Sequence, residues 1–381
     1  MGKLFAAAFV VLLALVSATG AARPATRAAA PLMQVTPNEL RLREPLAALA
    51  AEQGRAAFAF CNQLVGVWRP GGTVTRLGPA AQWACPPPRG LERVFSLALA
   101  GDRVAWAAGA GGNQVTNLLF LVVLNKPQTI RIPVLTAYCC RGSDPDQERL
   151  GDVYGDGGFI AFSSRLKCND SGAPGCPSGT RPRLISQTVW RLQRPPFRAL
   201  CVAGQVGPCV PLAILNEELT PLSVDSGRVA LRRTRGVFIV LNSSGRLVRR
   251  FRPVPDVDPA VELMGGRAVV AVPGRLRVFS VSRGAQLMSR PMPNVPTGGV
   301  CGMPPCPAAT LRLVDAARGL VAYILSGNLH LLRLRDGRDR VVATATDARF
   351  GDSGLFYTYT APAPWVARIR HVRWAALPVQ P

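Results

Sequence analysis

A short unit recurs along this chain of 381 residues and limits what the chain can fold into. In one copy, Leu99–Val123, a Gly-Asp turn precedes an apolar run at Arg103–Ala107. A glycine-rich reversal then leads into a second apolar run, Leu118–Leu124. Short apolar and aromatic runs separated by Gly, Asp or Ser predict β-strands joined by tight hairpins.

Seven such units, about 50 residues apart, are typical of the blades of a β-propeller. A unit of three or four short strands cannot bury its own faces, so neighbouring units must stack. We therefore predict an all-β fold, a single β-propeller of about seven blades over residues 51–378; six or eight blades also fit, since the first and last units are degenerate. The predicted turn glycines are Gly54, Gly101, Gly155, Gly227, Gly266, Gly319 and Gly351.

Two segments precede the predicted propeller. Lys3, the apolar run Leu4–Val16 and the small residues Ala18–Ala22 have the order of a secretory signal peptide, assigned here to residues 1–22. The apolar run is too short for the roughly 20 residues that span a bilayer. We expect a secreted, extracellular or cell-envelope protein without a transmembrane segment in the mature chain. Residues 23–50 form an Ala/Pro-rich lead-in, and 39–53 fit either a short helix or a strand.

The chain has ten cysteines, which after a signal peptide predict disulfide bonds formed in an oxidising compartment. Three pairs are close in sequence and lie in Pro/Gly loops: Cys168 with Cys176, Cys201 with Cys209, and Cys301 with Cys306. For the other four, either Cys61 bonds Cys85 while Cys139 and Cys140 form a vicinal disulfide, or the pairs cross over.

The formal net charge is +23, and nearly all of it comes from arginine. One interpretation is a surface for an anionic cell-wall polymer; the other is the codon bias of a GC-rich genome. The charge is spread in short clusters, which makes nucleic acid an unlikely partner. Inserted loops on a rigid scaffold often bind ligands. The candidate ligand-binding residues around the Cys-containing loops are Arg141, Arg165, Lys167, Arg181 and Arg183.

One acidic segment offers oxygen ligands for a metal such as calcium. Its candidate residues are Asp144, Asp146, Asp152 and Asp156. The segment lacks the EF-hand pattern, because Arg149 and Gly155 replace the required Gly and Glu, so a solvated loop is favoured. The two histidines, His330 and His371, are expected on strand faces in structural roles. No nucleophile motif occurs, so we expect no catalytic residue and no cofactor.

Three stretches resemble known propeller families. GDGGFIAFSSR (Gly155–Arg165) and VWRL (Val189–Leu192) resemble the WD40-like repeats of bacterial secreted propellers of the TolB type. VFIVLNSSGRLVRRF (Val237–Phe251) is similar to strand-turn-strand units of quinoprotein-like propellers. The TolB resemblance implies a propeller that docks a protein partner in the cell envelope.

These observations predict a non-enzymatic binding or scaffolding module at the cell envelope, with an anionic wall polymer or an envelope protein as its partner. The alternative is a propeller enzyme (a hydrolase, a lyase or a quinoprotein) acting on polysaccharide or small alcohols. Its candidate site is the acidic segment Asp144–Asp156, near the central channel. Adjacent Cys139 and Cys140 fit a quinoprotein, but the six tryptophans do not recur at one repeat position as its docking motif requires.

Overall fold

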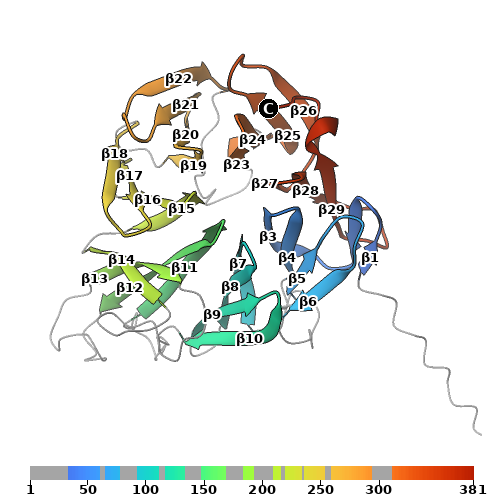
Figure 1. Cartoon of the computed structure of the whole chain (residues 1–381), viewed down its shortest axis with the longest axis horizontal. Coiled ribbons are helices and arrows are strands. Elements are labelled where there is room, and N and C mark those ends of the chain that lie inside the picture. Colours follow the sequence, from blue (N-terminus) through green and yellow to red (C-terminus); the bar gives the residue numbers. More distant parts are fainter. Residues whose placement is uncertain are drawn as a thin grey trace, which may run out of the picture. The chain divides into compact units, whose positions relative to one another are not determined.

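The computed structural model describes residues 33–60, 65–77, 92–110, 116–133, 147–168, 183–192, 209–215, 219–233, 236–253, 259–293 and 311–381. For parts of the strands between residues 92 and 215, only the backbone is described. Within these ranges the chain forms seven antiparallel sheets arranged in a ring (Figure 1). The fold is a seven-bladed β-propeller, which confirms the predicted fold class.

Six sheets have four strands in sequence order. The first three are β3–β6 (Leu46–Glu52, Arg55–Phe60, Val65–Trp68, Val74–Leu77), β7–β10 (Glu92–Ala100, Arg103–Ala110, Thr116–Val123, Lys126–Pro133) and β11–β14 (Gln147–Asp156, Phe159–Cys168, Arg183–Leu192, Cys209–Leu215). The next three are β15–β18 (Thr220–Asp225, Arg228–Arg232, Phe238–Asn242, Leu247–Phe251), β19–β22 (Ala260–Met264, Arg267–Val272, Arg275–Ser280, Gln286–Pro291) and β23–β26 (Leu311–Ala317, Leu320–Leu325, Asn328–Arg333, Asp339–Thr344).

The seventh sheet joins the two ends of the described chain. Its order is β1-β2-β29-β28-β27, and β2 pairs with β29 in the register Glu39↔Arg370. The strands are β1 (Met33–Val35), β2 (Glu39–Leu42), β27 (Asp347–Gly351), β28 (Gly354–Thr360) and β29 (Ala367–Arg373), followed by a 3-10 turn at Trp374–Ala376. This pairing closes the ring, because strands from both ends of the described chain lie in one sheet.

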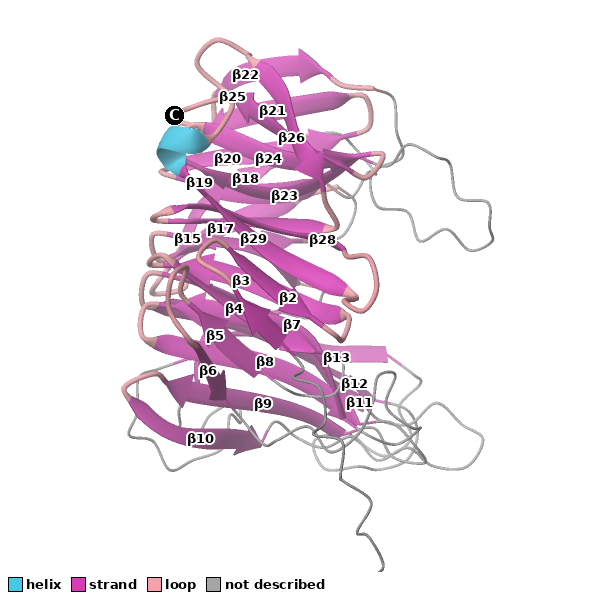
Figure 2. Cartoon of the chain, turned by 90° about the vertical axis from the view of Figure 1, so that its right-hand side faces the viewer, coloured by secondary structure: helices cyan, strands magenta, loops and turns pink. Residues whose placement is uncertain are grey.

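Each sheet presents its first strand to the ring axis, except that the closing sheet presents β27 (Figure 1). Each of these seven innermost strands contacts the innermost strand of the next sheet, and β27 contacts β3. Seen from the side, the strands run across the thickness of the ring, and the turns gather on its two faces (Figure 2). The innermost strands therefore form the wall of a central channel.

Tight turns connect each innermost strand to the second strand of its sheet. At Ser226-Gly227, φ is 51° and 71°, and at Gly265-Gly266 it is 52° and 80°. A two-residue hairpin of type I′ needs positive φ at both positions, which glycine adopts without strain. The glycines that marked the repeat in the sequence are thus, for the most part, the turns that follow the channel strands.

The apolar core lies between neighbouring sheets. One cluster packs the sheets β3–β6 and β7–β10 together and includes Trp106, which stacks on Phe120 with ring centroids 5.2 Å apart. Another packs β23–β26 against the closing sheet around Leu329 and Phe350. Stacking of sheets that could not bury their faces alone is what the repeat predicted.

Two boundaries differ from the sequence analysis. We expected each unit to begin at its turn glycine, whereas each sheet begins one strand earlier, with the channel strand. We also expected residues 23–50 to be a lead-in, whereas β1, β2 and most of β3 lie there and belong to the sheets. The ambiguous segment 39–53 is extended, because its residues alternate between the core and the channel or solvent. The described part of the chain contains no helix long and apolar enough to cross a membrane.

Candidate functional site

A cavity of about 770 Å³ runs along the channel and is bordered by all seven innermost strands. Side chains of a strand alternate between its two faces, so every second residue of these strands points to the axis. Equivalent channel positions can be counted back from the last residue of each strand. The second residue before the end is the most informative of them.

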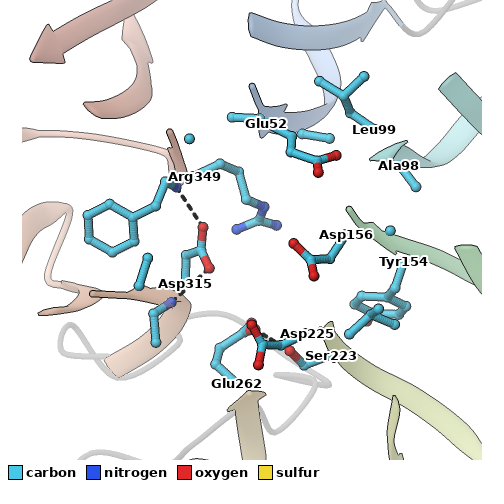
Figure 3. A pocket seen from close by; sticks show the side chains of 18 of the residues that line it. Glu52, Ala98, Leu99, Tyr154, Asp156, Ser223, Asp225, Glu262, Asp315 and Arg349 are labelled. Carbon is cyan, nitrogen blue, oxygen red and sulfur yellow. Dashed lines mark hydrogen bonds between the residues drawn. The ribbon is translucent and has the colours of Figure 1, made fainter. Parts of the chain in front are cut away.

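At this position the channel has two different walls. Strands β3 and β7 contribute only Ala50 and Ala98. The five following innermost strands contribute polar side chains, which point into the channel (Figure 3): Tyr154, Ser223, Glu262, Asp315 and Arg349. The small alanines leave the space that the cavity occupies, and the polar wall supplies its chemistry.

The channel has the opposite charge balance to the chain. Eight carboxylates border it, against three arginines, while the whole chain has 45 basic and 22 acidic residues. The carboxylates are Glu52, Asp152, Asp156, Asp225, Glu262, Asp315, Asp347 and Asp352; the arginines are Arg267, Arg318 and Arg349. A narrow channel of one charge sign, walled by protein, concentrates its electric field on whatever enters.

Three carboxylates end their strands at the mouth and bond to neighbouring sheets. Glu52 accepts the amide N–H of Gly101 at 2.7 Å and that of Gly157 at 2.6 Å. Asp156 accepts from Ser226 at 2.7 Å, and Asp225 from Gly265 at 2.9 Å. In each case, the side chain of one sheet accepts a hydrogen bond from a turn that follows another channel strand.

Deeper side chains bond by the same rule. The Ser96 hydroxyl accepts the Val153 amide at 2.9 Å, and the Ser223 hydroxyl accepts that of Leu263 at 3.0 Å. Asp315 accepts the amide of Phe350 at 2.6 Å. The innermost strands are sheet edges, whose outward N–H groups have no strand partner. Side chains from the preceding sheet satisfy these donors and fix neighbouring sheets to one another.

Glu262 is enclosed by protein apart from the cavity that its carboxyl borders. Burial, followed by repulsion from Asp315, raises its pKa to about 8. The Ser223 hydroxyl, its one hydrogen-bond donor in the described structure, lies 2.8 Å from Oε2. Burial also raises the pKa of Asp315, while Arg349 and the bonded amides lower it. At neutral pH, Glu262 is therefore mainly protonated.

Arg349 points into the channel but is bonded to its own wall. Its Nη1 atom lies 3.2 Å from Asp347 Oδ1 and donates to the Val314 carbonyl at 2.5 Å. Arg318 lies over the ring of Trp374, 4.9 Å from its centroid. These contacts account for two of the three channel arginines.

Tyr154 is enclosed on nearly all sides, and its hydroxyl faces the cavity. No side chain or backbone group of the described residues makes a hydrogen bond with this hydroxyl. Burial, together with the negative charges of Asp152 and Glu262, raises its pKa, so it stays protonated. Tyr154 keeps some exposed surface, so this hydroxyl is open to the cavity and can bond to a ligand there.

The predicted metal residues divide into two groups. Asp152 and Asp156 border the channel, the place the sequence analysis gave the acidic segment, whereas Asp144 and Asp146 lie outside the described residues. Among the residues that are described, no group of three His, Cys, Asp or Glu side chains could hold a metal ion. The sequence analysis missed Glu262, Asp315 and Arg349. Their shared position two residues before the end of the strand was the signal that could have revealed them.

Most of the predicted ligand-binding and disulfide residues cannot be placed. Arg165 and Lys167 lie on β12 and Arg183 on β13, but their side chains are outside the described structure, as are Arg141 and Arg181 altogether. The cysteine side chains also fall outside it: Cys61, Cys85, Cys139, Cys140, Cys168, Cys176, Cys201, Cys209, Cys301 and Cys306.

Both histidines have structural contacts. His330 lies between the buried Leu329 and Leu331 and stacks on Tyr323, with its Nδ1 3.3 Å from Asp339. His371 is buried, and its Nε2 lies 3.0 Å from the Ser353 hydroxyl. Burial lowers the pKa of His371. Neither residue borders the channel.

Many arginines bond to backbone carbonyls of neighbouring sheets. Arg55 donates to Gly101 at 2.8 Å, and Arg191 donates to Ser243 at 3.0 Å. The same kind of contact is made by Arg103, Arg249, Arg277, Arg290 and Arg312. A guanidinium suits this use because it carries several donors and stays charged. Part of the arginine excess thus holds the ring together.

Comparisons with known proteins leave the family open. No model of a known protein family matches the chain, and no curated protein matches it. Among solved structures, the chain is similar to the β-propeller domain of Cps50 (Swd1) from Myceliophteria thermophila, with 10% identity over 86% of this chain and 97% of that one and a TM-score of 0.47. It is also similar to Sqt1 from Saccharomyces cerevisiae (10% identity, 87% and 96% covered, TM-score 0.44) and to the computationally designed protein Ika8 (13%, 87% and 98%, TM-score 0.41).

Proposed function

We propose that this protein is a non-enzymatic binding module, and that its central channel binds a positively charged ligand. The observation that carries the proposal is the concentration of eight carboxylates around one cavity of a strongly basic chain. A second observation is the Tyr154 hydroxyl, which borders this cavity and has no hydrogen-bond partner among the described residues. Ligand pockets are typically concave sites in which a small number of polar groups are precisely placed.

The test is a thermal-shift and calorimetric comparison of small ligands that differ in charge. Arginine methyl ester and spermidine serve as cations, glucose as a neutral ligand and citrate as an anion. The proposal expects binding of the cations alone, weakened by Glu262→Gln and unchanged by Glu44→Gln, which alters a carboxylate outside the channel. Equal binding of citrate, or equal loss in both variants, would refute it.

We also propose that the protein is an exported bacterial propeller of the TolB type, with a cleaved signal peptide and five disulfide bonds. Support comes from the N-terminal residue pattern, the even number of cysteines and the Gly155–Arg165 stretch. Mass spectrometry of secreted, non-reduced protein tests this. A mature chain lacking the first residues and ten hydrogens is expected; an uncleaved or fully reduced chain would contradict it.

Docking of an anionic wall polymer or an envelope protein at the Cys-containing loops is a separate proposal. It rests on the basic residues Arg141, Arg165, Lys167, Arg181 and Arg183. Their replacement by serine should weaken salt-dependent pulldown on wall polymer. Unchanged pulldown would remove this surface from consideration.

A hydrolase is the second candidate function, and one observation favours it. Glu262, with its pKa raised to about 8, has the property of a general acid, and further carboxyl groups line the same channel. Glycoside hydrolysis uses such a pair. Release of nitrophenol from aryl glycosides by the purified protein, abolished in Glu262→Gln, would establish it; a rate equal to that of buffer would exclude these substrates.

A further inference from the structure

Building on the cation-binding function proposed above, we infer that the channel ligand is a linear alkyl polyammonium ion lying along the channel axis. Its ammonium groups would meet successive levels of carboxylates, and its methylene groups would pack against the alanine wall. Three features of the channel carry this inference: the spacing of the levels, the apolar wall and the unsatisfied polar groups.

Seven of the eight channel carboxylates lie at three levels along the axis, and Asp352 follows the end of β27. Glu52, Asp156 and Asp225 end their strands at the mouth. Glu262 and Asp315 lie two residues deeper, and Asp152 and Asp347 lie four residues deeper. Strands rise about 3.3 Å per residue, so successive levels are about 6.6 Å apart for strands along the axis. This spacing is close to the separation of two ammonium groups joined by four methylene groups.

The opposite wall favours methylene groups over hydroxyls. Ala48, Ala50 and Ala98 face the cavity there and offer only methyl groups. A sugar ring would leave hydroxyls on that side without a hydrogen-bond partner, which is unfavourable. An alkyl chain has no hydrogen bond to lose there, and its burial removes apolar surface from water. The combination of one apolar and one acidic wall matches an alkylammonium ion.

Two polar groups at the middle level are available to such a ligand. Among the described residues, no group bonds to the Tyr154 hydroxyl. Of the two carboxyl oxygens of Glu262, Oε2 receives a hydrogen bond from a described residue and Oε1 does not. An ammonium group is a donor of three hydrogen bonds and can satisfy both. Charge-assisted bonds of this type are stronger than those between neutral groups.

Arg349 does not exclude a cation from this level, because its charge is shared with Asp347 and Asp315. The charged and titratable groups that face Glu262 are Asp315, Asp347, Arg349 and Tyr154. An arriving ammonium group would stabilise the ionised form of Glu262 and expel its proton. Binding should therefore release close to one proton near pH 7 and tighten as the pH rises toward about 8.

Calorimetric titration of the full chain with alkyl diamines tests the inference. The probes are diaminoethane, 1,4-diaminobutane, 1,6-diaminohexane and butylamine. We expect diaminobutane to bind about tenfold more tightly than butylamine, as for one added charge-assisted hydrogen bond, and more tightly than the shorter and longer diamines. Titrations in buffers of different ionisation heat should show the proton release.

Two variants separate the channel from the surface. Glu262→Gln should abolish the proton release and weaken diaminobutane binding about tenfold, and Tyr154→Phe should weaken it about fivefold by removing one oxygen. Glu44→Gln should change neither quantity. Unchanged circular dichroism spectra would show that both channel variants fold.

The outcomes distinguish the two proposals. If butylamine and diaminobutane bind equally tightly and both lose affinity in Glu262→Gln, the channel binds cations but the polyammonium inference is wrong. If no amine binds, both proposals fail. If calcium chloride displaces diaminobutane at equal concentration, the ligand is a metal ion, and the inference is overturned.

Discussion

Glu52 offers the sharpest test of how the sheets are held together. Its carboxylate accepts the amides of Gly101 and Gly157, which belong to the second and third sheets. In Glu52→Ala, the buried Gly101 amide loses its acceptor, at about 1–3 kcal/mol, whereas the exposed Gly157 amide turns to water, at about 1 kcal/mol. Burial raises the pKa of Glu52, so removing its charge offsets part of this loss. The net loss should be about 2 kcal/mol.

Urea unfolding at neutral pH measures this loss, and hydrogen exchange of the Gly101 amide locates it. Glu52→Gln keeps one acceptor oxygen and should lose about half as much. Glu44→Ala, which removes a carboxylate without a hydrogen bond in the described structure, should change stability by less than about 0.5 kcal/mol. A loss below about 0.5 kcal/mol in Glu52→Ala, or unchanged exchange at Gly101, would refute this account of the ring.

Three further predictions concern stability. Because the pKa of Glu262 is raised to about 8, the folded state holds this proton more tightly than the unfolded chain does. The free energy of unfolding should therefore fall as the pH rises from about 4.5 to 8. Urea titrations across this range should show that Glu262→Gln removes part of that fall. Trp68→Ala should cost about 3–5 kcal/mol in urea unfolding, because this buried ring contacts Phe356 of the closing sheet, with centroids 6.1 Å apart; a loss like that of exposed Val341→Ala would contradict this. Gly354→Ala places a Cβ atom 2.1 Å from the Val372 carbonyl oxygen, so the melting temperature should fall by several degrees, as for about 2 kcal/mol or more; an unchanged melting temperature would show that β28 and β29 can separate there.

The sequence predicted the ring because its turns and apolar middle strands are regular. The channel strands are less regular: TPLSVD of β15 and LGDVYGD within β11 put polar residues where a buried strand has apolar ones. The sequence analysis therefore identified the turns more readily than the strands that precede them. These residues are polar because they face the channel, so the departure from the repeat marks the candidate site.

Local sequence patterns could not predict the channel. It brings Glu52 and Arg349 to one cavity although about 300 residues separate them in the sequence, and no local spacing encodes that proximity. Asp152 and Asp156 belong to an acidic run in the sequence, and both border the channel. Glu262 and Asp315 stand alone in apolar surroundings, and only their common register relative to the turn links them.

The closing sheet has a consequence for how the chain reaches its final form. Because β2 pairs with β29, β2 precedes its partner by more than 300 residues, and until β29 is synthesised one edge of β2 is unpaired. Joining distant segments is entropically less favourable than closing a hairpin, by about 0.6 kcal/mol for each doubling of the loop. Another copy at high concentration can supply the same strand first. Refolding in dilute solution should thus give closed monomers, and refolding in concentrated solution should give dimers that have exchanged their first strands.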